Sequence, residues 1–160
     1  MGRAPVPGGL RVLLGGKALI CEEQRGTVPE QFENLNVPIR QVARLSRRYR
    51  IIITHGNGPQ VGNLLLQQEC TGEVPRMPLE ILVAQTQGQI GYMIESTLDS
   101  ELMRRGMAVN KPLVSLISYV VVDENSPAFE NPTKPIGPVF TEERAGKLPY
   151  ATRKTERGYR

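Results

Sequence analysis

The sequence predicts an α/β domain with a mainly parallel, open sheet between helical layers, a three-layer αβα arrangement. Short apolar runs rich in β-branched residues alternate with longer segments whose apolar residues recur at helical spacing. The chain has 160 residues, of which 39% are hydrophobic and 22% charged. These values lie close to the globular average and exclude wholesale disorder. The 16 glycines and 13 prolines predict many tight turns.

The first part of the chain predicts two strands joined by a helix. Residues 11–14 form an apolar run typical of a buried strand, and residues 51–54 form a β-branched one. Residues 34–49 predict a helix that begins near Asn36, with Pro38 in its first turn. The apolar face of this helix would contain Val42, Leu45 and Tyr49. Because the connection is long enough for a helical crossover, we expect the two strands to be parallel.

The middle of the chain predicts two further helices. Residues 60–70 carry apolar side chains at helical spacing after Pro59, which suits a first helical position. Residues 78 to about 105 predict a longer helix with a four-residue repeat of Ile90, Ile94, Leu98 and Leu102. Gly88 and Gly91 lie inside it, where a glycine costs roughly 1 kcal/mol, so we expect close packing or ligand approach at these positions.

The last third of the chain changes in character. Residues 113–122 predict a third strand, and residues 123–160 predict turns and short hairpins that form a small protruding subdomain. We therefore expect residues 1–122 and 123–160 to be separate parts. Three strands make a thin parallel sheet, and parallel sheets are covered on both faces. The chain is therefore expected to be the first, truncated half of a larger fold.

Charge and composition limit the classes of partner that we expect. The net charge of +4 and a pI near 9.3 favour anionic ligands without choosing among them. The dense basic run is formed by Arg40, Arg44, Arg47, Arg48 and Arg50. Because it interleaves with a helical apolar face and lacks aromatic neighbours, a solvated helix face is favoured over a nucleic-acid patch. We expect no nucleic-acid partner.

The cysteines and the apolar runs indicate where in the cell we expect the protein. Cys21 and Cys70 are far apart and, with a single histidine, cannot build a zinc site or a disulfide framework. We expect both to be reduced, in the cytoplasm, and we expect no protein-held metal. No apolar run reaches the length of a membrane span, and the first residues lack a signal-peptide pattern.

Two glycine-containing stretches follow the predicted strands. Gly15 and Gly16 would let backbone N–H groups approach a phosphate, although a plain tight turn remains an alternative. Residues 55–62 lie between a strand and a helix, which argues against a hairpin and favours a ligand loop. In this loop Asn57 offers an amide and the glycines offer backbone donors. His55 is the only histidine, and a structural role is favoured for it.

A third stretch contains Lys134, held between Pro132 and Pro135. A lysine with so little backbone freedom can direct a point charge at a phosphate. Taken alone, an exposed loop lysine would be the simpler interpretation.

Together these stretches resemble carbamate kinase, a member of the amino acid kinase superfamily. The motifs that carry the resemblance are residues 14–19, 54–62, 87–92, 127–138 and 157–160, in the family's order and spacing. The resemblance covers the family's amino-terminal half. It implies an amino acid kinase-like fold and a cytoplasmic, homodimeric enzyme of arginine fermentation. That enzyme transfers phosphoryl between carbamoyl phosphate and ADP to make ATP, with Mg²⁺.

The resemblance also implies roles for individual residues. Lys134 would be catalytic, stabilising charge on the phosphoryl group from the protruding subdomain. Substrate and phosphate binding would involve Gly15, Gly16, Lys17, Gly56, Asn57 and Gly58, supported by His55, Gln60 and Gly88. In the family, ATP or ADP is held mostly by the carboxyl-terminal half, so weak nucleotide binding and weak activity are expected.

Several positions depart from the family pattern. Lys17 stands where asparagine is usual and Ser126 where aspartate is usual; the others are Glu80, Gln89 and Lys154. These departures suggest a diverged copy. A non-catalytic anion-binding or interaction fragment, a partner for a separately encoded second half, and a sibling kinase for another carboxylate or phosphonate therefore remain alternatives.

Overall fold

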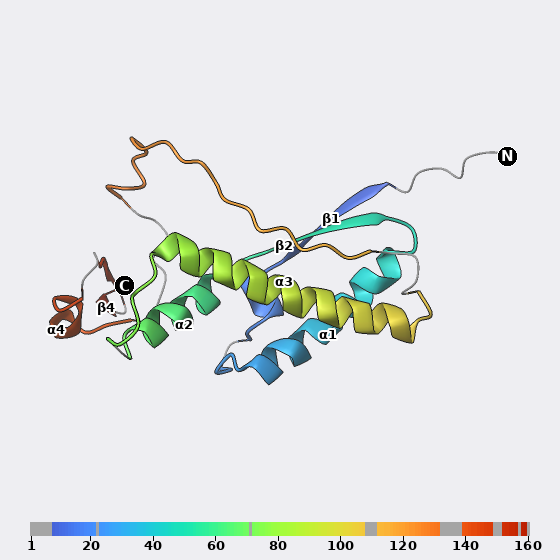
Figure 1. Ribbon diagram of the computed structural model, residues 1–160, viewed down its shortest axis with the longest axis horizontal. Coiled ribbons are helices and arrows are strands. Elements are labelled where there is room, and N and C mark those ends of the chain that lie inside the picture. The colour runs from blue at the N-terminus through green and yellow to red at the C-terminus, as the bar shows by residue number, and fades with distance from the viewer. Residues whose placement is uncertain are drawn as a thin grey trace. The chain divides into compact units, whose positions relative to one another are not determined.

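The computed structural model describes residues 8–21, 23–70, 72–107, 112–131, 139–148, 152–156 and 158–159. Its elements are β1 (Gly9–Leu14), the 3₁₀ turn η1 (Gly16–Ala18), α1 (Val28–Leu45), β2 (Arg50–His55), α2 (Gly58–Gln68), α3 (Leu79–Arg104), α4 (Glu142–Ala145), β3 (Lys154–Thr155) and β4 (Gly158–Tyr159) (Figure 1). They fall into two compact units, Met1–Asn57 with Gln87–Leu116 and Gly58–Thr86 with Ile117–Arg160. The division expected after residue 122 stays a prediction.

The first unit contains the parallel strand pair that the sequence predicts. Strands β1 and β2 pair in parallel, with Leu14 opposite His55 at their carboxyl ends. Burial alternates along both strands, as expected when a single face of a sheet is covered. On the other face Leu13 is 73% exposed and Ile52 is 61% exposed. The described residues therefore cover one face of this sheet, and the expected third layer is not seen among them.

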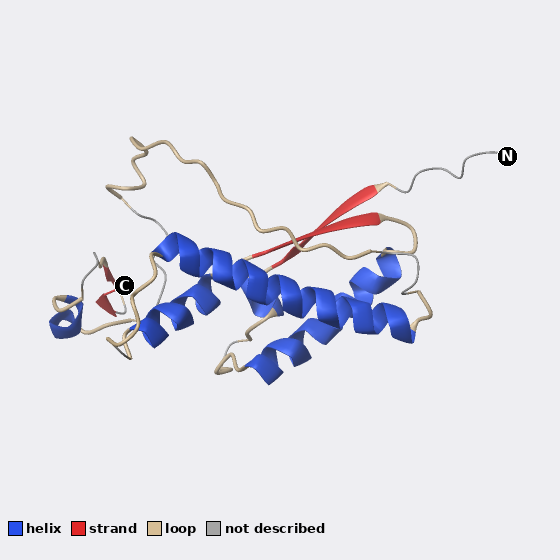
Figure 2. Cartoon of the chain, in the orientation of Figure 1, coloured by secondary structure: helices blue, strands red, loops and turns tan. Residues whose placement is uncertain are grey.

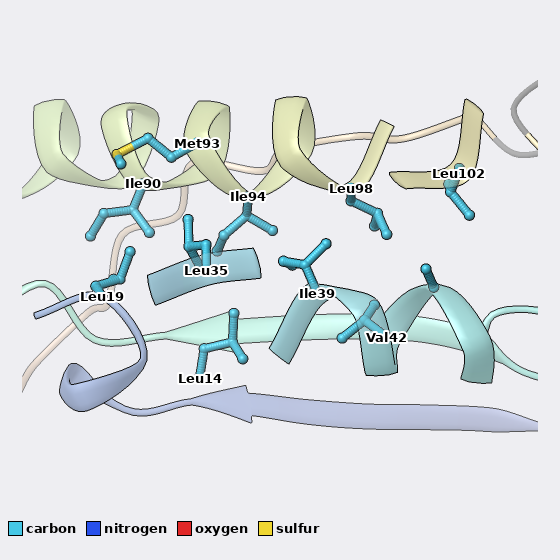
Figure 3. Close-up of a cluster of buried hydrophobic side chains, with 11 residues drawn as sticks. Leu14, Leu19, Leu35, Ile39, Val42, Ile90, Met93, Ile94, Leu98 and Leu102 are labelled. Atoms are coloured by element: carbon cyan, nitrogen blue, oxygen red, sulfur yellow. The ribbon is translucent and has the colours of Figure 1, made fainter. Parts of the chain in front are cut away.

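Helices α1 and α3 bury the covered face of the sheet. Figure 3 shows side chains of α1 and α3 gathered in one cluster with Leu14 of β1 and with Leu19. The predicted stripe of α3 is confirmed, because Ile90, Ile94, Leu98 and Leu102 are between 0% and 7% exposed. Gly91 is explained by close packing, since a Cβ there would lie 3.0 Å from the Ser115 hydroxyl oxygen.

The predicted start of the first helix is wrong: α1 begins at Val28, eight residues before Asn36. Its start is stabilised by Thr27, whose N–H donates to the Glu30 carboxylate at 2.7 Å, the arrangement of a capping box. This hydrogen bond lowers the pKa of the Glu30 carboxyl. Pro38 lies inside the helix rather than in its first turn. Proline suits the start of a helix because it has no backbone N–H to donate, and Pro38 therefore suggested that the helix begins near it. Inside α1 the loss of this hydrogen bond is tolerated because one face of the helix is packed.

The predicted third strand is also corrected. Residues 112–122 form no strand in the described part of the chain, and Figure 2 shows them as loop. The segment is tied to the first unit at its start, where the Ser115 hydroxyl donates to the Glu95 carboxylate at 2.8 Å. Strand-forming residues make a strand only when a neighbour accepts and donates backbone hydrogen bonds. The described residues provide no such neighbour for this segment.

The second unit contains α2 and the turn-rich carboxyl-terminal part. Gln68 fixes the link between α2 and α3, because its side chain accepts from the Met77 N–H at 2.6 Å. Further along, β3 and β4 pair antiparallel, and Phe140 bridges to Tyr159. The Tyr159 hydroxyl donates to the Glu142 carboxylate at 2.9 Å, a bond that raises the pKa of Tyr159. These short elements confirm the turns and hairpins expected here.

All five arginines of the basic run are exposed, but only Arg40 and Arg44 lie on a helix, because α1 ends at Leu45. The predicted apolar face is wrong in part, since Leu45 and Tyr49 are each 39% exposed. Within the described ranges no helix is both long enough and apolar enough to cross a membrane.

The last turn of α3 contains a buried carboxylate held by two arginines. Glu101 is 9% exposed. It accepts hydrogen bonds from Arg104 Nε at 2.9 Å and from Arg105 Nε at 2.6 Å. The hydrogen bond from Arg104, reinforced by Arg105, lowers the pKa of Glu101 from 4.5 to about 2. The charged form of Glu101 is therefore favoured in the folded chain.

Replacing Glu101 with glutamine is expected to reduce stability in a pH-dependent way. A carboxyl whose pKa is lower in the folded state stabilises the fold above its unfolded pKa and loses that effect as the pH falls. The difference in unfolding free energy between the wild type and Glu101→Gln should therefore be full at pH 7. It should shrink between pH 4.5 and pH 2. Urea unfolding across this range measures it, and a difference that stays constant with pH would contradict the role given to the ion pairs.

Candidate phosphate-binding site

Two loops begin side by side at the carboxyl end of the parallel strands. Leu14 pairs with His55, so Gly15 and Gly56 follow neighbouring positions of β1 and β2. Adjacent strands lie about 4.8 Å apart, so the two loops leave the sheet one strand spacing from each other. The carboxyl ends of parallel strands are where open α/β sheets bind ligands. The register therefore brings together the two glycine stretches that the sequence singled out.

The first loop turns at once into η1. Gly15 is extended, with φ −68° and ψ 169°. The turn then closes through hydrogen bonds from the Ala18 N–H to the Gly15 carbonyl at 2.9 Å and from the Leu19 N–H to the Gly16 carbonyl at 3.1 Å. The first N–H groups of such a turn have no partner within it, which suits an anionic acceptor. No acidic residue lies in the first turn of η1 or of α2.

The glycines of these loops have no packing reason within the described residues. A Cβ built at Gly15, Gly16, Gly56 or Gly58 would meet no described atom within 4 Å, and the same holds for Gly88 inside α3. Nor do they take the left-handed conformation, which among described glycines occurs at Gly26, Gly106 and Gly158. Close approach of a ligand to the backbone is the remaining common use of glycine. Within the described residues nothing occupies the Cβ position of any of these glycines.

The other predicted site residues are placed as follows. His55 is half-buried, and its Nδ1 lies 3.3 Å from the Gly56 carbonyl oxygen, a local contact that agrees with a structural role. Asn57 is half-buried and belongs to the first unit. Gly58 and Gln60 lie in the first turn of α2, in the second unit, and Gln60 is 4% exposed. The side chain of Lys17 and the whole of Lys134 lie outside the described residues.

Sequence reasoning missed the side chains that hold the chain behind the glycine turn. Gln31 Nε2 donates to the Gly26 carbonyl at 2.7 Å, and Asn34 Nδ2 donates to the Leu19 carbonyl at 2.9 Å and to Gln24 Oε1 at 2.6 Å. These bonds anchor residues 19–26 to α1 and so position η1. The signal was present, since Gln31 and Asn34 are polar residues three apart on one helix face. It was overlooked because the helix was expected to begin after them.

Metal-binding groups do not gather in the described part of the chain. No three His, Cys, Asp or Glu side chains within it come together in a way that could hold a metal ion. Cys21 and Cys70 are free and exposed.

Comparisons with known proteins show what the chain is similar to. No protein-family model matches the chain. The carbamate kinase of Thermococcus kodakarensis is 46% identical to it over 142 residues, covering 86% of this chain and 44% of that relative. The structure of Giardia lamblia carbamate kinase bound to citric acid superposes with a TM-score of 0.81 at 31% identity. It covers 98% of this chain and 52% of that one. The chain is similar in sequence and in structure to part of the carbamate kinases.

The relationship to carbamate kinases extends over part of their length. The chain spans about half the length of the curated relatives it matches. The Giardia enzyme bound to AMP-PNP superposes with a TM-score of 0.77 at 32% identity, again over 98% of this chain and 51% of that one. The resemblance read from the motifs is thus confirmed, and so is a carbamate kinase-like fold with a parallel sheet and helices.

Proposed function

We propose that this chain provides the carbamoyl phosphate side of a carbamate kinase-type reaction, in which ATP and carbamate are interconverted with ADP and carbamoyl phosphate. One observation carries the proposal. Two glycine loops, whose open backbones lack a packing explanation, leave adjacent parallel strands at the paired residues Leu14 and His55. The relationship to carbamate kinases supplies the reaction.

The phosphoryl transfer depends on positioning and on charge, and not on covalent catalysis by the protein. A carbamate oxygen attacks the γ-phosphorus of ATP, and the bond from that phosphorus to the ADP oxygen breaks. Catalysis of such transfers is mostly orientation and electrostatic stabilisation of the phosphoryl oxygens. The N–H groups at Gly15, Gly16, Gly56 and Gly58 would bind those oxygens, with Asn57 as a further donor. Lys134 and Lys17 would add positive charge.

The cofactors follow from the relatives. We propose ATP and ADP as the nucleotides, since a similar Giardia enzyme is bound to AMP-PNP. We expect the nucleotide to be held mainly by residues outside the part of the relatives that this chain matches. Protein-held Mg²⁺ usually takes one or two carboxylates besides phosphate oxygens. Among the described residues no group of three or more His, Cys, Asp or Glu side chains could hold a metal ion, and Mg²⁺ stays a prediction that rests on the resemblance. A homodimer and a cytoplasmic location rest on the resemblance alone and stay predictions.

Two measurements test the proposal together. Titration calorimetry with carbamoyl phosphate should detect binding, and a coupled assay should detect ATP formed from carbamoyl phosphate and ADP. Binding accompanied by turnover supports the full proposal. Binding without turnover supports the non-catalytic, anion-binding alternative. A chain that folds but binds no carbamoyl phosphate contradicts both.

Replacing Gly16 with alanine is expected to separate binding from stability. A Cβ at Gly16 would meet no atom of the described residues within 4 Å, so the unfolding free energy should stay unchanged or rise by up to about 1 kcal/mol. Binding of carbamoyl phosphate should weaken roughly tenfold or more, because a methyl group would displace a charged acceptor from the backbone N–H. Urea unfolding and calorimetry measure the two effects.

Gly26→Ala is the matched contrast. Gly26 has φ +74°, and a Cβ there would lie 2.7 Å from Ile20 Cδ1. We expect this variant to lose about 1–3 kcal/mol of stability. If Gly16→Ala instead lowers stability and leaves binding unchanged, Gly16 has a structural role and the proposed phosphate contact is wrong.

A further inference from the structure

A pair of side-chain amides holds the chain directly after the glycine turn η1. Asn34, on α1, donates from Nδ2 to the Leu19 carbonyl at 2.9 Å and to Gln24 Oε1 at 2.6 Å. The same Gln24 oxygen accepts from the Cys21 N–H at 2.9 Å. Asn34 and Gln24 are both half-buried. Asn34 thus holds two residues that lie 15 and 10 positions earlier in the chain.

Leu19 is held by its side chain as well as by its carbonyl. The side chain is 1% exposed and belongs to the same buried cluster as Leu35 and Ile90 (Figure 3). The Leu19 N–H closes η1 by donating to the Gly16 carbonyl at 3.1 Å, and the Ile20 N–H donates to the same carbonyl at 3.0 Å. The position of the Leu19 backbone therefore determines the direction of the Gly16 carbonyl.

The directions of the carbonyls in η1 also set the directions of its first N–H groups. In a planar trans peptide group the C=O and the N–H point in opposite directions. The Gly15 carbonyl accepts from the Ala18 N–H at 2.9 Å, and the Gly16 carbonyl accepts from the Leu19 N–H. The N–H groups of Gly16 and Lys17 share peptide groups with these two carbonyls, so they point away from the hydrogen bonds of the turn. These are donors that the proposed phosphate site uses.

Helix α1 by itself does not account for an asparagine at position 34. Asparagine is less favourable than alanine in a helix interior. A structural role is nevertheless the alternative, because Pro38 has no N–H to donate to the Asn34 carbonyl and so weakens α1 at this point. A structural role predicts a loss of stability alone, whereas a role in the site predicts a loss of ligand affinity as well.

We propose that Asn34 is a positioning residue for the phosphate site: with Gln24, its amide fixes η1 so that the N–H groups of Gly16 and Lys17 are oriented before carbamoyl phosphate binds. Donors that are already oriented bind an anion more tightly, because the backbone does not have to be ordered on binding. This inference rests on the proposed function, since it takes the glycine turn as the place where carbamoyl phosphate binds.

Asn34→Ala is expected to weaken binding of carbamoyl phosphate about tenfold or more, because small displacements of positioned groups are costly. Titration calorimetry measures the affinity, and urea unfolding shows that each variant is folded. Asn36→Ala is the matched chemical control, because Asn36 is an exposed asparagine of the same helix, and it should change neither measurement. Val42→Ala is the stability control. Val42 is 2% exposed on α1, so this variant should unfold at lower urea and bind as the wild type does.

Gln24→Ala keeps the test decisive if Asn34→Ala does not fold. It removes the oxygen that accepts from Asn34 and from the Cys21 N–H, at a half-buried position outside the helix. We expect it to weaken binding of carbamoyl phosphate about threefold or more, the effect of about one hydrogen bond.

The outcomes separate this inference from the proposed function. A folded wild type that binds no carbamoyl phosphate contradicts the proposed function, and the role of Asn34 with it. If the wild type binds and folded Asn34→Ala binds equally well, the role of Asn34 alone is overturned. The same holds for Gln24→Ala where Asn34→Ala does not fold. Losses of affinity as large in Val42→Ala as in Asn34→Ala would reflect stability in general and would also overturn the proposal.

Discussion

Replacing Lys134 with alanine is expected to lower the rate of ATP formation from carbamoyl phosphate and ADP by about 10²–10³-fold. We propose that Lys134 provides a fixed positive charge beside the transferred phosphoryl group. Such a charge stabilises the transition state more than the ground state, so its removal should reduce kcat more than it raises KM. Initial rates across a range of carbamoyl phosphate concentrations separate the two parameters.

Two further variants distinguish a directed charge from general electrostatics. Lys134→Arg keeps the charge and should retain more activity than Lys134→Ala, although a guanidinium does not replace an ammonium fully. Lys147→Ala removes an exposed lysine that pairs with Glu143 at 2.7 Å, and it should leave the rate unchanged. If the Lys134→Ala and Lys147→Ala variants turn over alike, Lys134 has no role at the site. If turnover is too slow to measure, weaker binding of carbamoyl phosphate by Lys134→Ala becomes the readout.

Replacing Ile90 with alanine is expected to cost about 2–5 kcal/mol of stability. Ile90 is 0% exposed in the cluster where α3 packs on α1 and the strands (Figure 3). Deleting three carbon atoms there removes buried apolar contact and leaves a cavity that the surrounding side chains fill only in part. A lower urea midpoint with an unchanged slope is the expected result.

Met103→Ala serves as the control on the same helix. Met103 is 63% exposed, so its replacement should change stability by no more than about 0.5 kcal/mol. Similar losses in both variants would show that the cost comes from helix α3 as a whole rather than from the core. An Ile90→Ala variant as stable as the wild type would mean that the core in Figure 3 does not support this unit.

Local sequence was a good guide wherever a short stretch determines its own conformation. The apolar stripe of α3 predicted a helix from Pro78 to Arg105, and the structure has Leu79–Arg104. The isoleucine run predicted β2, which extends to Arg50–His55. The glycine stretches after both strands predicted the loops of the candidate site. In each case periodicity or turn-forming residues act over a few positions and need little help from the rest of the fold.

The start of α1 and the third strand depended on context that a single stretch does not contain. Pro38 was a plausible start, but the capping box at Thr27 and the packed face of α1 decided the boundary. Residues 113–122 have strand-forming side chains, but a strand exists only with a hydrogen-bonded neighbour. Propensity predicts what a segment can become, and tertiary partners decide whether it does.

For the candidate site, the sequence by itself determined the chemistry of each loop: bare glycine backbones, an amide and the adjacent Lys17. Only the tertiary structure decided that Gly15 and Gly56 follow paired residues of adjacent strands. It also showed that a Cβ at either glycine would meet open space, so packing does not explain them. The physical reason is that residue type sets what a loop can bind, whereas strand register, fixed by hydrogen bonds between residues 41 positions apart, sets which loops can bind it together.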